Sequence, residues 1–218
     1  MSSPVAIYGA SGCGRGVMPL ARAQWALEGQ KHGLVFVDDD PISSIINGHS
    51  VLRYVDWLTS FAGDKFINIA IANSMLRQKL AERCESDGVK FFEVRASNVV
   101  QLDNVTVGEG AILCPFVTLT SNIKIGKHFH ANLYSYVEHD CVIGDYVTFA
   151  PGVKCNGNIL IEDHAYIGSG AVIKQGKPGS PIVIGRGAIV GMGAVVTKSV
   201  PPGVTVIGNP ARPMNIKI

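Results

Sequence analysis

A hydrophobic position recurs every six residues through the second half of the chain. From Val107 onwards, twelve consecutive positions in this register are apolar, and we call them the anchors. The anchors are Val107, Leu113, Leu119, Ile125, Ala131, Val137, Ile143, Phe149, Cys155, Ile161, Ile167 and Ile173. A period of six fits neither a helix, with about 3.6 residues per turn, nor a flat strand, with its simple alternation. It predicts a β-solenoid, in which short strands alternate with corners and three six-residue units close one coil.

A second position of the repeat supports this interpretation. Four residues after each anchor stands a small or apolar residue, with Lys177 as the exception. A single coil cannot bury its own anchors. We therefore expect the coils to fold together as one stack, with neighbouring strands roughly 4.8 Å apart.

The register of the repeat breaks once, after Ile173. The next anchor, Ile184, comes eleven residues later, and Val190 and Val196 then continue the repeat. The extra residues fall in 174–181, a polar segment with two prolines and two glycines. Because these residues are poorly tolerated inside a strand, we expect the segment to leave the coil as a loop.

The residues ahead of the repeat alternate short apolar runs with helical patterns. They predict strands at 5–8, 34–37, 67–71 and 89–94, and helices at 17–27 and 74–85. We therefore predict an α/β domain of the half-Rossmann, nucleotide-binding type at 1–96, followed by a parallel β-helix domain at 97–218. A complete NAD-binding Rossmann domain usually needs more than the roughly 95 residues that are present here.

A glycine-rich segment, 9–16, connects the first predicted strand to the first predicted helix. Glycines allow a ligand to approach the backbone, and N–H groups at the start of a helix attract anions. The second predicted strand ends in three aspartates, 38–40, and an acid at this place commonly contacts a ribose or a base. These features indicate a nucleotide-phosphate site. The alternative is that the glycines only form a turn, since their spacing GxxGxG differs from the dinucleotide-binding GxGxxG. The aspartates would then be a solvated strand end.

Composition adds little beyond exclusions. The formal net charge is +2 and there is no basic run, so nothing points to a nucleic-acid partner. The five cysteines form no CxxC pair, which favours reduced packing residues in a cytoplasmic protein. No run of eighteen apolar residues that could span a membrane is present.

His139 is the strongest candidate for chemistry. It stands two residues after an anchor, near a corner of the coil, where its side chain is expected to point outward. Either neighbour, Glu138 or Asp140, is a carboxylate that can hold one ring nitrogen and raise the basicity of the other. A plain surface histidine is the alternative interpretation.

A metal site is not expected. His128 and His164 are 36 residues apart and occupy the same point of the repeat. The γ-class carbonic anhydrases share such a solenoid and bind zinc through three histidines. The position of the third histidine holds Ser169 here, so the ligand set is incomplete.

Several short motifs together resemble a known family. The six-residue array, GNPAR at 208–212 and VEHD at 137–140 look like the left-handed β-helix acyltransferases. IYGASGCG at 7–14, the strand-ending Asp38 and IAIANSMLRQKL at 69–80 narrow this to the bacterial sugar-nucleotide acetyltransferases of the PglD and NeuD kind. The resemblance covers nearly the whole chain.

The resemblance implies a reaction and an assembly. Members of this family transfer an acetyl group from acetyl-CoA, without a metal. The nearest implied acceptor is the 4-amino group of a UDP-4-amino-4,6-dideoxy-N-acetylglucosamine type of sugar, in the biosynthesis of bacillosamine-type glycans. The resemblance also implies a homotrimer with active sites at the subunit interfaces.

The resemblance further implies roles for individual residues. His139 is the implied general base and Asp140 its orienting partner. The residues implied to bind acetyl-CoA are Asn132, Gly157, Ser169 and Met192, with Gly157 giving a backbone N–H to the thioester carbonyl. The residues implied to bind the nucleotide sugar are Gly9, Ser11, Gly12, Cys13, Asp38 and Asn73. The loop 174–181 is expected to border the CoA channel.

Two departures from the family pattern bear on the acceptor. Cys13 stands where proteins of the PglD kind have a histidine, and Thr148 stands where another family histidine often lies. The nucleotide, UDP or dTDP, and the stereochemistry of the sugar therefore stay open. An O-acetyltransferase of a sialic-acid-like sugar and a non-catalytic, nucleotide-sensing trimeric scaffold are the alternative functions.

Overall fold

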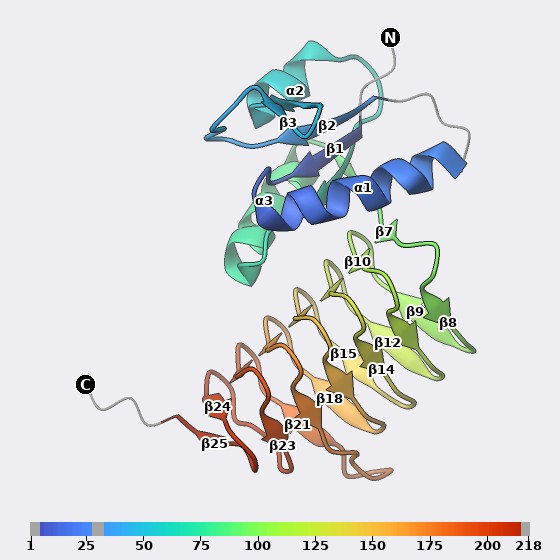
Figure 1. Cartoon of the computed structure of the whole chain (residues 1–218), viewed down its shortest axis with the longest axis vertical. Coiled ribbons are helices and arrows are strands. Elements are labelled where there is room, and N and C mark those ends of the chain that lie inside the picture. Colours follow the sequence, from blue (N-terminus) through green and yellow to red (C-terminus); the bar gives the residue numbers. More distant parts are fainter. Residues whose placement is uncertain (1–4, 28–32, 215–218) are drawn as a thin grey trace. The chain divides into compact units, whose positions relative to one another are not determined.

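The computed structural model describes residues 5–27 and 33–214 of the chain. These residues form two compact units, drawn in Figure 1. The first unit ends at Ser97 and also includes Glu109–Ile112. The second unit comprises Asn98–Gly108 and the chain from Leu113 onwards. No helix among the described residues is long and apolar enough to cross a membrane.

The first unit is a six-stranded, mostly parallel sheet with helices. Its elements are β1 (Val5–Tyr8), α1 (Gly12–Leu27), β2 (Leu34–Val37), β3 (Ile45–Ile46), β4 (His49–Leu52), α2 (Tyr54–Ser60), β5 (Phe66–Ile69), α3 (Ser74–Ser86), β6 (Lys90–Phe91) and β7 (Val94–Arg95). The order of strands in the sheet is β3-β4-β2-β1-β5-β6, and only β3 is antiparallel to its neighbour. Helix α1 packs on β1 and β2, and α3 packs on β5.

The connections of this sheet change direction at β1. From β1 the chain crosses to β2 on one side, and it later returns to β5 on the other side of β1. In open parallel sheets, ligands bind outside the carboxyl ends of the strands at such a switch point. The segments that follow β1 and β5 meet there, which is where the sequence predicted a nucleotide site.

Some predictions for this unit were wrong. Helix α1 begins at Gly12, five residues earlier than expected, so most of the glycine-rich segment is helical rather than a turn. Close packing explains one of these glycines, because a Cβ on Gly14 would overlap the carbonyl of Gly9. The strand expected at 89–94 is two short strands, β6 and β7, since Lys90 pairs with β5 while the Val94 N–H bonds the carbonyl of Ala111.

The second unit is a three-sided parallel β-helix, seen in Figure 1 as a ladder of short strands. The sheet of the first face begins with β7, which is not part of the six-stranded sheet. It continues with β10 (Ile112–Leu113), β13 (His130–Ala131), β16 (Thr148–Phe149), β19 (Tyr166–Ile167), β22 (Ile189–Val190), β24 (Thr205–Ile207) and β25 (Arg212–Pro213). The second face holds β8 (Val100–Gln101), β11 (Thr118–Leu119), β14 (Tyr136–Val137), β17 (Lys154–Cys155), β20 (Val172–Ile173) and β23 (Val195–Val196). The third face holds β9 (Val105–Val107), β12 (Ile123–Ile125), β15 (Val142–Ile143), β18 (Ile159–Ile161) and β21 (Ile182–Ile184).

The register of the strands confirms the six-residue repeat. Along the second face, Leu119 pairs with Val137 and Val137 pairs with Cys155, each one coil further on. All the anchors from Leu113 to Val196 are buried and form one continuous hydrophobic core. The β-helix begins earlier than the anchors suggested. Strand β8 already pairs with β11, and this pairing places the polar Gln101 in an anchor position.

The predicted loop leaves the coil as expected. Strand β20 ends at Ile173, β21 begins at Ile182, and Lys177 and Ser180 pair with each other in a tight turn. The base of the loop is fixed by two backbone hydrogen bonds. Gly176 N–H donates to the carbonyl of Gly157 at 2.9 Å, and Ile182 N–H donates to that of Asn158 at 3.3 Å.

Candidate functional site

A column of polar residues runs along the corner between the second and third faces. It consists of Asn104, Asn122, Asp140 and Asn158, one in each successive coil. All four have a left-handed backbone, with φ between 56° and 58°. Asn and Asp tolerate this conformation better than other non-glycine residues, so the shape of the corner selects them.

Hydrogen bonds join three members of the column to His139. Asn104 Nδ2 donates to Asn122 Oδ1 at 2.9 Å, and Asn122 Nδ2 donates to Asp140 Oδ1 at 3.1 Å. The other carboxylate oxygen, Oδ2 of Asp140, lies 2.7 Å from Nδ1 of His139. This series of hydrogen bonds therefore ends in an imidazole–carboxylate pair. Nδ1 of the imidazole is engaged by the carboxylate, and Nε2 is the ring nitrogen left for a substrate.

The hydrogen bond between His139 and Asp140 shifts the pKa of both side chains. Its hydrogen bond with Asp140 raises the pKa of His139 above the ordinary value of 6.5, against a smaller lowering by burial. The pKa of Asp140 is lowered first by its hydrogen bond to His139 and next by that from Asn122. The two side chains are 44% and 49% exposed, so His139 points outward as predicted and is open to a substrate.

Gly157 lies directly against the imidazole. A Cβ on this residue would stand 2.5 Å from Cε1 and 2.6 Å from Nε2 of His139, so a side chain there would displace the imidazole. The carbonyl of Gly157 accepts the N–H of Gly176. Its own N–H donates to no other residue in the described part of the chain, which leaves it available to a ligand.

The residues on either side of Gly157 are held in place. Asn156 accepts a hydrogen bond from the Tyr136 hydroxyl at 2.9 Å and donates to the carbonyl of Ile173 at 2.8 Å. Asn158 N–H donates to the carbonyl of His139 at 3.0 Å. The Gly157 peptide is therefore fixed relative to His139 before any ligand binds.

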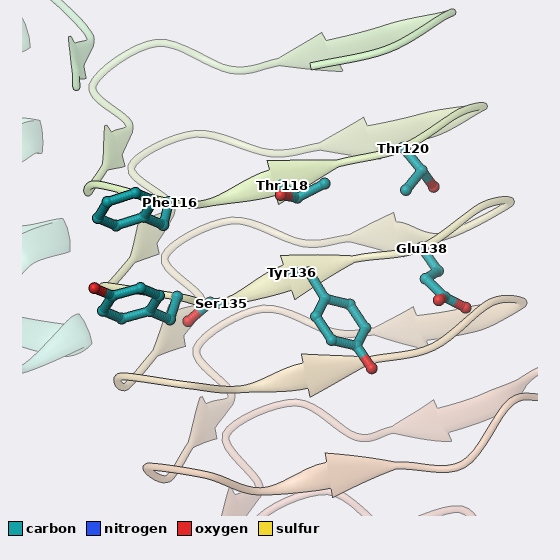
Figure 2. A pocket seen from close by; sticks show the side chains of 7 residues that line it. Phe116, Thr118, Thr120, Ser135, Tyr136 and Glu138 are labelled. Atoms are coloured by element: carbon teal, nitrogen blue, oxygen red, sulfur yellow. The ribbon is translucent and has the colours of Figure 1, made fainter. Parts of the chain in front are cut away.

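A shallow pocket of about 260 Å³ opens on the second face beside this corner. Figure 2 shows its lining, which comes from two successive coils. Thr118 and Thr120 project from one coil, and Tyr136 and Glu138 project from the next. The carboxylate of Glu138 thus faces this pocket, whereas that of Asp140 holds His139.

The residues implied to bind acetyl-CoA do not all lie together. Gly157 adjoins His139, but Asn132, Ser169 and Met192 stand at the corner between the first and second faces. Asn132 Nδ2 donates to the carbonyl of Phe149 at 2.9 Å, and Met192 is 82% exposed. Within one chain, the full width of the second face separates these two groups.

The residues implied to bind the nucleotide gather at the carboxyl edge of the first unit. Gly9, Ser11 and Gly12 lie between β1 and the first turn of α1, and Asp38 follows β2. The carboxylate of Asp38 accepts the N–H groups of Ala10, at 3.0 Å, and of Asp40, at 3.2 Å. Asp38 therefore ties the turn after β1 to the end of β2.

Asn73 and Cys13 complete the set of residues implied to bind the nucleotide sugar. The Asn73 side chain caps α3 by accepting the N–H of Leu76 at 2.9 Å. Cys13 is partly exposed, and burial raises the pKa of its thiol, so it is a neutral group at physiological pH. Buried Arg77 donates to the carbonyls of Ile71 and Ala72 and holds the segment that follows β5.

His128 and His164, which occupy the same point of the repeat, are separated by a tyrosine. His128, Tyr146 and His164 stack along the corner between the third and first faces, with ring centroids 5.2 Å apart at each step. Among residues 5–27 and 33–214, no group of three metal-ligating side chains was found.

Sequence reasoning missed Asn122 and Asn156. Asn122 contacts Asp140, and Asn156 stands next to Gly157, so both adjoin residues that the sequence had singled out. The signal for Asn122 was present, because Asn104, Asn122 and Asp140 recur at the length of one coil. Asn156 has no such signature, since its role depends on the Tyr136 hydroxyl of the preceding coil.

Comparisons with known proteins agree with this architecture. Residues 4–84 match the family model of the PglD N-terminal domain. The chain is 54% identical over 209 residues to the GDP-perosamine N-acetyltransferase of Escherichia coli O157:H7, covering 95% of both chains.

Solved structures are similar over the same length. WeeI from Acinetobacter baumannii AYE has a TM-score of 0.93 and 62% identity, covering 97% of this chain and 99% of that one. The acetyltransferase domain of PglB from Neisseria gonorrhoeae FA1090, in complex with acetyl coenzyme A, has a TM-score of 0.83 and 26% identity, covering 98% and 100%. These similarities confirm the predicted fold class, an α/β domain followed by a left-handed β-helix. The chain therefore belongs to the acetyl-CoA-dependent sugar N-acetyltransferases in which a PglD-type N-terminal domain precedes that β-helix.

Proposed function

We propose that the chain acetylates the 4-amino group of a nucleotide-linked 4-amino-4,6-dideoxy sugar, with His139 as the general base. The observation that carries this proposal is the joint geometry of His139, Asp140 and Gly157. An imidazole with one nitrogen held by a carboxylate lies against a glycine whose N–H has no partner in the described chain. This arrangement offers a proton acceptor and an oxyanion donor side by side.

His139 accepts the proton through Nε2. Only an uncharged amine has a lone pair that can attack the thioester carbonyl, so a base must remove a proton from the amine or from the ammonium that forms. Asp140 keeps Nδ1 protonated and stabilises the imidazolium that results. The Gly157 N–H donates to the oxygen of the tetrahedral intermediate, and the CoA thiolate then leaves. Holding both substrates in one complex supplies much of the rate.

The proposal also concerns which nucleotide-linked sugar accepts the acetyl group. The Escherichia coli relative is named for GDP-perosamine, whose sugar is a 4-amino-4,6-dideoxyhexose. The family resemblance implied a UDP-linked sugar with the same reactive amine. The two share the reacting amine and differ in the nucleotide base, the ring stereochemistry and the substituent at C2. We assign the nucleotide to the carboxyl edge of the first unit, residues 1–96, and acetyl-CoA to the β-helix, residues 97–218.

The enzyme is proposed to act as a homotrimer. The separation of Asn132, Ser169 and Met192 from His139 within one chain supports this, because a neighbouring copy can present the missing corner. The loop 174–181, whose base is bonded to Gly157, is then proposed to border the CoA channel. Light scattering after size exclusion should give three times the 23.2 kDa chain mass, and a monomer that is fully active would contradict the assembly.

The acceptor is tested by measuring CoA release with acetyl-CoA and a panel of sugars. The panel contains GDP-perosamine, UDP-4-amino-4,6-dideoxy-N-acetylglucosamine, its dTDP-linked counterpart and a free nonulosonic acid. Turnover with at least one nucleotide-linked 4-amino sugar is expected, and mass spectrometry should place the acetyl group on nitrogen. Turnover with the nonulosonic acid alone would identify an O-acetyltransferase. Absence of acetyl-CoA binding by calorimetry would identify a scaffold.

A further inference from the structure

Asn122 fixes the carboxylate that His139 depends on. It stands one coil before Asp140 at the same corner and donates Nδ2–H to Asp140 Oδ1 at 3.1 Å. The other oxygen of Asp140 lies 2.7 Å from Nδ1 of His139. The two oxygens of this exposed carboxylate are thus held by one partner each.

The orientation of the Asn122 amide is itself determined. Oδ1 of Asn122 accepts a hydrogen bond from Nδ2 of Asn104 at 2.9 Å, so the NH₂ group is turned towards Asp140. The backbone at the corner is held as well. Asn122 N–H donates to the carbonyl of Asp103, and Asp140 N–H donates to that of Ser121, each at 3.1 Å. The donor is therefore preorganised rather than one of several rotamers.

We propose that Asn122 is a positioning residue for acetyl transfer, which fixes the carboxylate of Asp140 and through it the plane and tautomer of His139. This inference rests on the proposed function of His139 as the general base. Without the Asn122 donor, an Asp140 side chain that is about half exposed has only the imidazole to hold it. Carboxylate and imidazole can then rotate together away from the line of proton transfer, at a cost in rate rather than in substrate affinity.

Asn122→Gly removes the donor without straining the left-handed corner, because glycine adopts a positive φ freely. Asn104→Gly is the comparison variant. It has the same φ region and keeps the Asn122 donor, but it loses the hydrogen bond that orients the Asn122 amide. For Asn122→Gly, kcat is expected to fall roughly three- to tenfold while both KM values stay within about twofold. For Asn104→Gly, kcat should fall less than for Asn122→Gly, by about twofold, because Asn122 keeps its donor and loses only the bond that orients it.

Asn122→Asp gives a second, independent measurement. The titratable groups that raise the pKa of the imidazole by their charge are Asp140, Glu138 and Cys141. A further carboxylate in contact with Asp140 favours the imidazolium, so a higher pH is needed to deprotonate His139. The acid limb of kcat/KM should therefore move upwards by about half a pH unit or more. A residue that only supports the fold would leave this limb in place.

The possible results separate this inference from the proposed function. If His139→Ala removes activity while Asn122→Gly and Asn104→Gly behave alike, and Asn122→Asp leaves the acid limb unmoved, the positioning role is wrong and the general base stands. If His139→Ala is as active as the wild type, the proposed function fails first. Thermal unfolding of each variant shows whether the fold is intact, and the kcat values are compared per folded protein.

Discussion

Asp140 and Glu138 both carry a carboxylate next to His139, but the backbone of Asp140 is left-handed. Its φ of 58° places it at the left-handed corner, where its side chain lies in line with Asn122 and beside the imidazole. Glu138 comes one residue before His139 and lines the pocket on the second face. At the scale of single residues, the conformation of the corner therefore decides which carboxylate holds the imidazole of His139.

The charge of Asp140 should be visible in the pH profile. Because its carboxylate raises the pKa of His139, the acid limb of kcat/KM in the wild type should lie above pH 6.5. Asp140→Asn removes the charge, so the limb should move to lower pH while the plateau falls by about tenfold from lost orientation. Asparagine already occupies this corner at Asn104, Asn122 and Asn158, so the fold should tolerate the change. An unchanged limb would contradict the role of Asp140.

Gly157 should tolerate no side chain. The Cβ of Gly157→Ala would contact Cε1 and Nε2 of His139, so the imidazole has to swing away and weaken its bond to Asp140. We expect kcat to fall on the order of tenfold or more, since misplacement of a catalytic group is costly. Circular dichroism should show an intact fold. Wild-type kcat in this variant would mean that the glycine is not needed for the position of the base.

The sequence predicted the site only in part at this scale. His139 could be found because it stands outside the anchor register between two carboxylates. The choice of Asp140 over Glu138 could not be made, because it depends on a backbone angle that both residues can adopt. The contacts of Asp38 with Ala10 and Asp40 were also not predictable, since they arise when two strand ends meet.

The strands of the β-helix were predicted from the anchors alone. A fully buried apolar residue at every sixth position leaves little choice of register, because a shift by one residue would expose the whole set. Where the anchor is polar, as at Gln101, the first strand of the second face went unnoticed. Strand β4, with His49 and Ser50 in its four residues, was missed for the same reason.

Phe149 should carry much of the stability of its coil. It is fully buried and packs edge-to-face on Phe129, with centroids 5.1 Å apart. Phe149→Ala is therefore expected to lower the free energy of unfolding by about 3–5 kcal/mol. Phe116→Ala, at a side chain that is half exposed, should cost about 1 kcal/mol or less. Urea denaturation at one protein concentration checks both, and equal losses would contradict the assignment of Phe149 to the core.

At the scale of the whole molecule, the chain combines two kinds of ligand-binding architecture. The α/β unit presents the ends of strands and the start of a helix, which suit the phosphates of a nucleoside diphosphate. The β-helix presents rigid corners, on which a base and a backbone donor keep fixed positions. This architecture agrees with the proposal that the chemistry lies on outward residues, while the buried anchors hold the coils together.

The central claim is that His139 is the general base of amine acetylation. Its most direct test is kcat of His139→Ala in the CoA-release assay, with the nucleotide-linked 4-amino sugar that the wild type uses and both substrates saturating. We predict a loss on the order of 100-fold or more, with acetyl-CoA affinity by calorimetry unchanged within about threefold. A kcat within about threefold of the wild type would contradict the claim, since general base catalysis contributes far more than that.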